Sequence, residues 1–111
     1  MHKVAFLTTI FPMKDKYLLD FFNSLVEQSY KFFDIVVVND GYEKFRKIRE
    51  KYNNLTIIEL PCTSTPAKNR EYGINYCLDK KYDILIFGDS DDYFSNNRVA
   101  LSMKYLETHD I

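Results

Sequence analysis

The chain has few of the residues that interrupt or cross-link a fold. Of its 111 residues, three are Gly, three are Pro, two are Cys and none is Trp. A hydrophobic content of 46% with 28% charged residues indicates a folded chain and argues against disorder. Cys62 and Cys77 lie in no CxxC or Cys/His cluster, so we expect two reduced thiols. The length predicts one domain, residues 1–111.

Long hydrophobic runs and an excess of one charge are also missing. The longest apolar runs have four or five residues, whereas a membrane-spanning helix needs about 20. No signal-peptide pattern opens the chain. The net charge is −1 with both signs interspersed, which disfavours a nucleic-acid surface. We therefore expect a cytoplasmic protein with no transmembrane segment and no nucleic-acid partner.

Four short apolar runs alternate with longer amphipathic segments. The runs are β-branched or aromatic and continuous, as in strands buried on both faces of a parallel sheet; they cover residues 4–10, 33–39, 55–60 and 82–88. Helical spacing predicts helices over 15–29, 43–53, a segment opened by Thr65-Pro66, and 97–108. Ala67, Arg70, Ile74, Cys77 and Leu78 mark the third helix. The alternation predicts an α/β Rossmann-like three-layer sandwich.

Polar residues follow three of the predicted strands. If the strand order is 3-2-1-4, the ends of the first, second and fourth strands line one crevice. Thr8 and Thr9 end the first strand, Asp40 follows the second, and three carboxylates follow the fourth within "GDSDD". We call Asp89, Asp91 and Asp92 the acidic cluster.

The acidic cluster has no Lys or Arg within five residues on either side. Carboxylate oxygens are the ligands that Mg²⁺ and Mn²⁺ prefer, so the cluster predicts a divalent metal site. Arg70, in the first turns of the third helix, is placed to donate two hydrogen bonds to a diphosphate.

Each of these residues also has a structural interpretation. Asp and Ser form turns, so the acidic cluster fits a strand end that caps the next segment. Asp40 and Glu43 have the spacing of a capping box for the second helix. Arg70 fits a solvated helix residue equally well.

The quoted motifs have a counterpart in a known family. Through residues 17–41, 65–77 and 83–92, the chain resembles the N-terminal, nucleotide-sugar-binding half of inverting family 2 glycosyltransferases with the GT-A fold. The resemblance implies transfer of a sugar, with inversion, from a nucleoside-diphosphate sugar to an acceptor hydroxyl. The implied donor is a UDP-sugar, and the implied acceptor is a glycan or a lipid-linked glycan.

The resemblance also implies a role for each site residue. Asp40 corresponds to the acid that hydrogen-bonds the nucleotide base, and Thr8 and Thr9 lie where the first strand contacts that base. Arg70 corresponds to the arginine that precedes a glycine by three positions, here Gly73.

Asp89-Ser90-Asp91 resembles the family's DxD motif. The resemblance implies that Asp89 faces the ribose, that Asp91 binds Mn²⁺ or Mg²⁺, and that Asp92 supports the metal site.

The same resemblance places the acceptor-binding half and its general base beyond Ile111. We therefore expect these residues to bind a nucleotide sugar but to catalyse its transfer poorly on their own. Separately, an exposed strand at the edge of the sheet would be a template for pairing with a second chain, which predicts a homodimer. Two other functions stay open. One is a non-catalytic Mg²⁺- or nucleotide-binding regulatory module, and the other is a phosphohydrolase, although its DxD nucleophile would follow the first strand.

Overall fold

A computed structural model describes residues 2–88, 99 and 103 of the chain. It contains a sheet of four parallel strands in the order β3-β2-β1-β4. The strands are β1 (Val4–Ile10), β2 (Asp34–Asn39), β3 (Ile57–Pro61) and β4 (Ile84–Phe87). The helices are α1 (Asp15–Val26), α2 (Phe45–Arg49) and α3 (Pro66–Asp79). The predicted α/β fold and the strand order 3-2-1-4 are confirmed.

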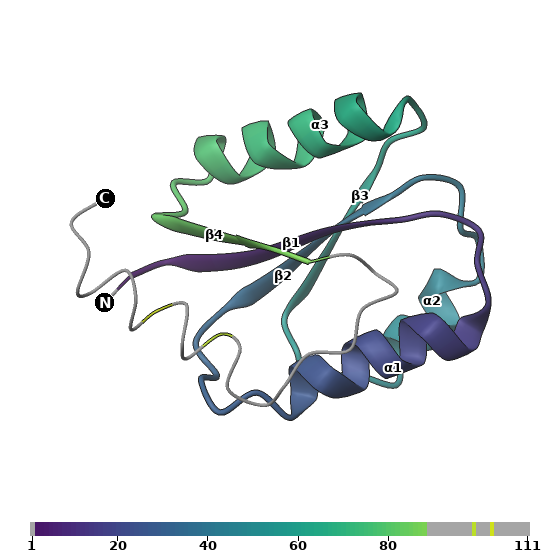
Figure 1. Cartoon of the computed structure of the whole chain (residues 1–111), viewed down its shortest axis with the longest axis horizontal. Coiled ribbons are helices and arrows are strands. Elements are labelled where there is room, and N and C mark those ends of the chain that lie inside the picture. Colours follow the sequence, from purple (N-terminus) through teal and green to yellow (C-terminus); the bar gives the residue numbers. More distant parts are fainter. Residues whose placement is uncertain (1, 89–98, 100–102, 104–111) are drawn as a thin grey trace.

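The sheet lies between two layers of helices (Figure 1). α3 covers one face, and α1 and α2 lie on the opposite face. β3 and β4 are the edge strands of the described sheet. In the register of β1 with its two neighbours, Thr9 pairs with Val38 in β2, and Leu7 pairs with Phe87 in β4. The carboxyl ends of β1, β2 and β4 therefore lie along one edge of the sheet.

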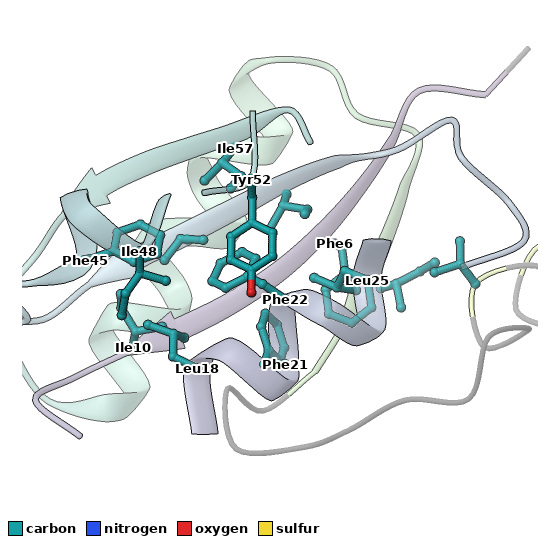
Figure 2. Close-up of a cluster of buried hydrophobic side chains, with 14 of the residues drawn as sticks. Phe6, Ile10, Leu18, Phe21, Phe22, Leu25, Phe45, Ile48, Tyr52 and Ile57 are labelled. Carbon is teal, nitrogen blue, oxygen red and sulfur yellow. The ribbon is translucent and has the colours of Figure 1, made fainter. Parts of the chain in front are cut away.

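The face of the sheet under α1 is closed by aromatic side chains (Figure 2). Phe22 on α1 is fully buried, and its ring centroid lies 5.1 Å from that of Phe21, 5.8 Å from that of Phe45 and 5.3 Å from that of Tyr52. Such ring pairs add about 0.5–1.5 kcal/mol each to the stability gained from burial. This cluster joins α1, α2 and the sheet into one core.

α3 approaches the opposite face closely, because Gly73 has no side chain. A Cβ atom at this position would lie 2.7 Å from Leu7 Cδ1 and 2.9 Å from Val38 Cγ2. The buried line of α3 is Asn69, Gly73 and Cys77. The predicted helix is confirmed, and of the residues that marked it Cys77 is buried, whereas Ala67, Arg70 and Leu78 are exposed.

The start of α3 follows the prediction. Thr65 is the N-cap, and its Oγ1 accepts a hydrogen bond from the Lys68 amide at 3.2 Å. Pro66 is the first helical residue, where the missing amide hydrogen leaves no hydrogen bond unmade.

The other helices are shorter than their predicted ranges. α1 ends at Val26, where 15–29 was predicted, and α2 covers five residues of the predicted 43–53. Of the predicted helix 97–108, only Val99 and Met103 lie within the described residues; both are helical and buried. The Val99 amide donates a 2.9 Å hydrogen bond to the buried side chain of Gln28. Within the described residues, no helix has the length and hydropathy to cross a membrane.

Candidate functional site at the carboxyl edge of the sheet

A small hollow opens where β1 and β4 end and α3 begins. We call it the edge hollow; its volume is ≈ 60 Å³, and it is lined by Leu7, Thr8, Thr9, Arg70, Phe87 and Gly88. The end of β1 and the first turns of α3 therefore bring Thr8, Thr9 and Arg70 to one hollow. Asp40, which the sequence analysis placed in the same crevice, is not among its lining residues. Pockets for whole small-molecule ligands have volumes of about 300–1,000 Å³. The edge hollow, as the described residues form it, is smaller than such a pocket.

Thr8 and Thr9 point to opposite faces of the sheet, because side chains alternate along a strand. Leu7 packs in the cluster under α3, and Phe6 packs in the cluster under α1. Thr9 therefore lies on the α3 face with Arg70, whereas Thr8 faces the α1 side. Thr8 is 3% exposed, and its Oγ1 is buried without a hydrogen-bond partner among the described residues. The two threonines therefore contribute to the site from different faces of β1.

Asp40 is held by a tight turn at the end of β2. Its amide donates a 2.8 Å hydrogen bond to the carbonyl oxygen of Ile10 in β1. Gly41 follows with φ +80°, a backbone conformation that side chains disfavour. The capping-box interpretation of Asp40 is wrong, because the N-cap of α2 is Lys44, whose side chain makes no capping hydrogen bond. The Asp40 carboxylate instead accepts a hydrogen bond from Asn69 on α3.

A hydrogen-bond network from Asn39 fixes that turn. Its Oδ1 accepts from the Tyr42 amide at 2.8 Å, and its Nδ2 donates to the Tyr42 carbonyl at 3.0 Å and to Glu59 Oε2 at 2.9 Å. Glu59 also lies 3.4 Å from Nη1 of Arg49. The side chain of Asn39 therefore bridges the turn after β2 to the neighbouring strand β3.

Tyr42 attaches the same turn to the start of α1. Its hydroxyl donates a hydrogen bond to Asp15, the first residue of α1. Burial raises the pKa of Tyr42 to about 12, and the hydrogen bond and negative charge of Asp15 act in the same direction. The phenol therefore stays neutral and able to donate at physiological pH.

Asn69 is a site residue that the sequence interpretation missed. It is 1% exposed, and its Nδ2 donates to Asp40 Oδ2 at 2.8 Å and more distantly, at 3.4 Å, to the Ser64 carbonyl. Its Oδ1 is buried with no partner among the described residues. A spacing of four residues puts Asn69 on one line with Gly73 and Cys77. That spacing was the available signal, but it did not reveal the contact with Asp40.

The acidic cluster of Asp89, Asp91 and Asp92 lies outside the described residues. The residue before it is placed: the Gly88 amide donates a 3.3 Å hydrogen bond to the Leu7 carbonyl. The chain thus leaves β4 beside the end of β1. In the part of the chain that the structure describes, no three His, Cys, Asp or Glu side chains gather as metal ligands.

A larger hollow, the α2 hollow, lies at the start of β3. Its volume is ≈ 350 Å³, and its lining includes Arg46, Arg49 and Ile57. Parallel sheets bind ligands beyond the carboxyl ends of their strands, and Ile57 begins its strand. The α2 hollow is therefore larger but lies away from the edge that collects Thr9, Asp40 and Arg70.

Comparisons with known proteins agree with this fold. The family model of glycosyl transferase family 2 matches residues 10–111. A search of curated proteins found no match to the chain.

Solved structures give the same fold. S. aureus TarS is 26% identical with a TM-score of 0.81, over 96% of this chain and 20% of that one. TarS 1–349 in complex with UDP-GlcNAc is 25% identical with a TM-score of 0.82, over 96% of this chain and 32% of that one. A mannosyltransferase from Pyrobaculum calidifontis, solved with GDP-Man and Mn²⁺, is 18% identical with a TM-score of 0.76, over 95% of this chain and 32% of that one. The chain spans about a third or less of the length of these proteins.

Proposed function

The chain belongs to glycosyl transferase family 2, and we propose that the carboxyl edge of its sheet binds the nucleoside-diphosphate part of a sugar donor. The observation that carries the proposal is the edge hollow, where Thr9 and Arg70 meet the end of β4. Arg70 is exposed, so its guanidinium is accessible to a ligand. A guanidinium can donate two parallel hydrogen bonds to a diphosphate. Asp40, one strand away, supplies an acceptor for the base.

The proposed nucleotide is uridine diphosphate. Support comes from TarS, which reaches 25–26% identity and was solved with UDP and with UDP-GlcNAc. The structure solved with GDP-Man is 18% identical, so that its likeness concerns the fold alone. The glycan or lipid-linked acceptor stays a proposal on the family resemblance.

The acidic cluster is the proposed metal site. Asp89, Asp91 and Asp92 supply only carboxylate oxygens, which fit the preference of Mn²⁺ and Mg²⁺. Gly88, at the end of β4, starts this segment beside the edge hollow. A bound divalent ion would offset the negative charge that grows on the departing diphosphate.

The proposed reaction breaks the bond between the anomeric carbon and the diphosphate. The acceptor hydroxyl forms the new bond from the opposite face, so the configuration at that carbon inverts, and a general base takes the hydroxyl proton. Asp40 and Arg70 hold the donor in this scheme, and neither is proposed as that base. We therefore propose donor binding as the activity of the residues described.

Calorimetric titration of uridine diphosphate, with and without Mn²⁺, tests the proposal. We expect binding that strengthens with Mn²⁺ and loses that dependence in Asp91→Ala. Asp79→Ala is the matched control, because Asp79 is an exposed carboxylate at the far end of α3. Absence of nucleotide binding under both conditions would contradict the proposal.

Binding and activity measurements separate the other two functions. A regulatory module would bind uridine diphosphate without preferring a donor that carries a sugar, such as UDP-GlcNAc, and a phosphohydrolase would cleave a generic aryl phosphate. Sedimentation velocity tests the proposed homodimer, which a clean monomer at high concentration would exclude.

A further inference from the structure

We propose that Arg49 closes the β3 edge of the sheet to pairing with a further strand, so that the proposed homodimer does not form along β3. β3 is one of the two edge strands of the described sheet, and an uncovered edge is a template for strand addition. The observation that carries the inference is a 3.0 Å hydrogen bond from Arg49 Nη2 to the carbonyl oxygen of Ile57, the first residue of β3. The inference concerns the fold and does not depend on nucleotide binding.

The hydrogen bonds between β2 and β3 show which backbone groups of β3 face outward. The carbonyl of Thr56, just before β3, accepts from the amide of Ile35 in β2 at 2.8 Å. The amide of Cys62, just after β3, donates to the carbonyl of Asn39 in β2 at 3.1 Å. Because the backbone groups of successive strand residues point to alternate sides, the even-numbered residues of β3 face β2. The backbone polar groups of three residues therefore face away from the sheet: Ile57, Glu59 and Pro61.

Two of these three residues present an incomplete edge. The outward carbonyl of Ile57 accepts the hydrogen bond from Arg49, and Pro61 has no N–H to donate. The carboxylate of Glu59, between them, lies 3.4 Å from Nη1 of Arg49. An added strand would thus meet a guanidinium at one end of β3 and a missing donor at the other. Charged side chains, proline and short length are common protections of a sheet edge.

Arg49 is held in this position by the helix that carries it. Phe45 and Ile48 of α2 are buried in the aromatic cluster under the sheet. The guanidinium at the end of that anchored helix has two partners, the Ile57 carbonyl and the Glu59 carboxylate. A strand that paired with Ile57 would have to displace a charged donor from its acceptor. Charge-assisted hydrogen bonds are stronger than the neutral ones that would replace them, so the exchange is unfavourable.

Hydrogen exchange in the unaltered protein is the first test. The Glu59 amide faces away from β2, so strand pairing along β3 would give it a new hydrogen bond and slow its exchange. We expect its exchange rate to be the same in dilute and concentrated protein, whether or not sedimentation shows a dimer. The Leu60 amide faces β2 and reports that the sheet is intact. Slower exchange at Glu59 in concentrated protein, with Leu60 unchanged, would overturn the inference.

The second test removes the guanidinium with Arg49→Met, which keeps a long apolar side chain. A two-fold pair of copies would use the released Ile57 carbonyl of each, so association should begin at concentrations at least about tenfold lower than in the unaltered protein. Exchange at Glu59 should slow as the variant associates. Arg46→Met is the matched control, because it removes the same charge from α2 at a side chain that is 89% exposed. Association of Arg49→Met no stronger than that of Arg46→Met would overturn the inference.

Glu59→Gln separates the covered carbonyl from the ion pair. This variant loses the negative charge that faces Arg49 but leaves the hydrogen bond from Arg49 to Ile57, so its association should match that of the unaltered protein. An increase as large as that of Arg49→Met would mean that the ion pair protects the edge, and would overturn the inference. The exchange test needs no variant, so it decides the matter even if Arg49→Met does not fold.

Discussion

Aromatic rings close the face of the sheet under α1, whereas small and polar side chains join α3 to the opposite face. Under α1, Phe21, Phe22 and Phe45 are fully buried, and the ring of Phe22 contacts the other two. Along α3 the buried residues are Asn69, Gly73 and Cys77. Large rings maximise buried apolar area and hence stability. Small residues instead bring the helix close to the strands, and this closeness lets Asn69 reach Asp40.

The two faces of the sheet therefore have different roles, one in stability and the other in forming the candidate site. The α1 face gives a rigid base, and the α3 face carries the groups that surround the edge hollow. Substitutions under α1 should therefore change stability more than nucleotide affinity. Substitutions along α3 should change affinity more than their effect on stability would suggest.

The largest expected effect is Phe22→Ala. Removing a fully buried ring costs about 3–5 kcal/mol in free energy of unfolding, measured by urea denaturation. Phe32→Ala is the matched control, because its ring is 62% exposed, and it should change stability by less than about 1 kcal/mol. Equal effects at the two positions would contradict the proposed role of the aromatic cluster.

Gly73→Val should cause the next largest loss of stability. The new side chain would overlap Leu7 and Val38, whose atoms lie 2.7 and 2.9 Å from the Cβ position, and overpacking costs about 1–3 kcal/mol. Because the helix must move away, affinity for uridine diphosphate should fall as well. Tyr72→Val places the same residue on the exposed side of α3 and should leave affinity unchanged. An affinity that survives Gly73→Val would break the link between close packing and the site.

Arg70→Ala should lower the affinity for uridine diphosphate about tenfold, the worth of a charge-assisted hydrogen bond. Its free energy of unfolding should change by no more than about 0.5 kcal/mol, because Arg70 is exposed. Arg70→Lys keeps the charge but lacks the two parallel donors, so its affinity for uridine diphosphate should lie between those of the unaltered protein and Arg70→Ala. Lys68→Ala removes a nearby exposed cation and is the control; an equal loss there would point to general charge attraction.

Thr65→Ala should give the smallest effect. It removes the N-cap hydrogen bond to the Lys68 amide, which costs about 1 kcal/mol of stability. Thr63→Ala, two residues earlier and exposed, should cost less, as seen in thermal unfolding. Equal destabilisation at both positions would mean that the cap adds nothing.

The sequence was sufficient for the strands because strands depend on local patterns, whereas the order 3-2-1-4 was assumed from the fold class and then confirmed. Continuous apolar runs such as residues 33–39 fit strands only when both faces are covered, and helices between them demand parallel crossovers. The helix start at Thr65-Pro66 followed from the same kind of local rule.

The packed face of α3 and the partner of Asp40 could not be obtained in that way. Leu78 is more apolar than Asn69, yet Leu78 is 63% exposed and Asn69 is buried. The difference arises from a contact between residues 29 positions apart, and no local pattern encodes such a pairing. The hydrogen bond from Asn39 to Glu59 on another strand is likewise a contact that no local pattern encodes.

Chemical-shift mapping of backbone amides during titration with uridine diphosphate and Mg²⁺ tests the central claim most directly. The account predicts that the shifts concentrate at the edge hollow, with Thr9, Arg70 and Gly88 among the largest. Arg46, Arg49 and Ile57 in the α2 hollow should not move. Shifts confined to the α2 hollow, with none at the three residues of the edge hollow, would contradict the claim that the carboxyl edge of the sheet binds the nucleotide.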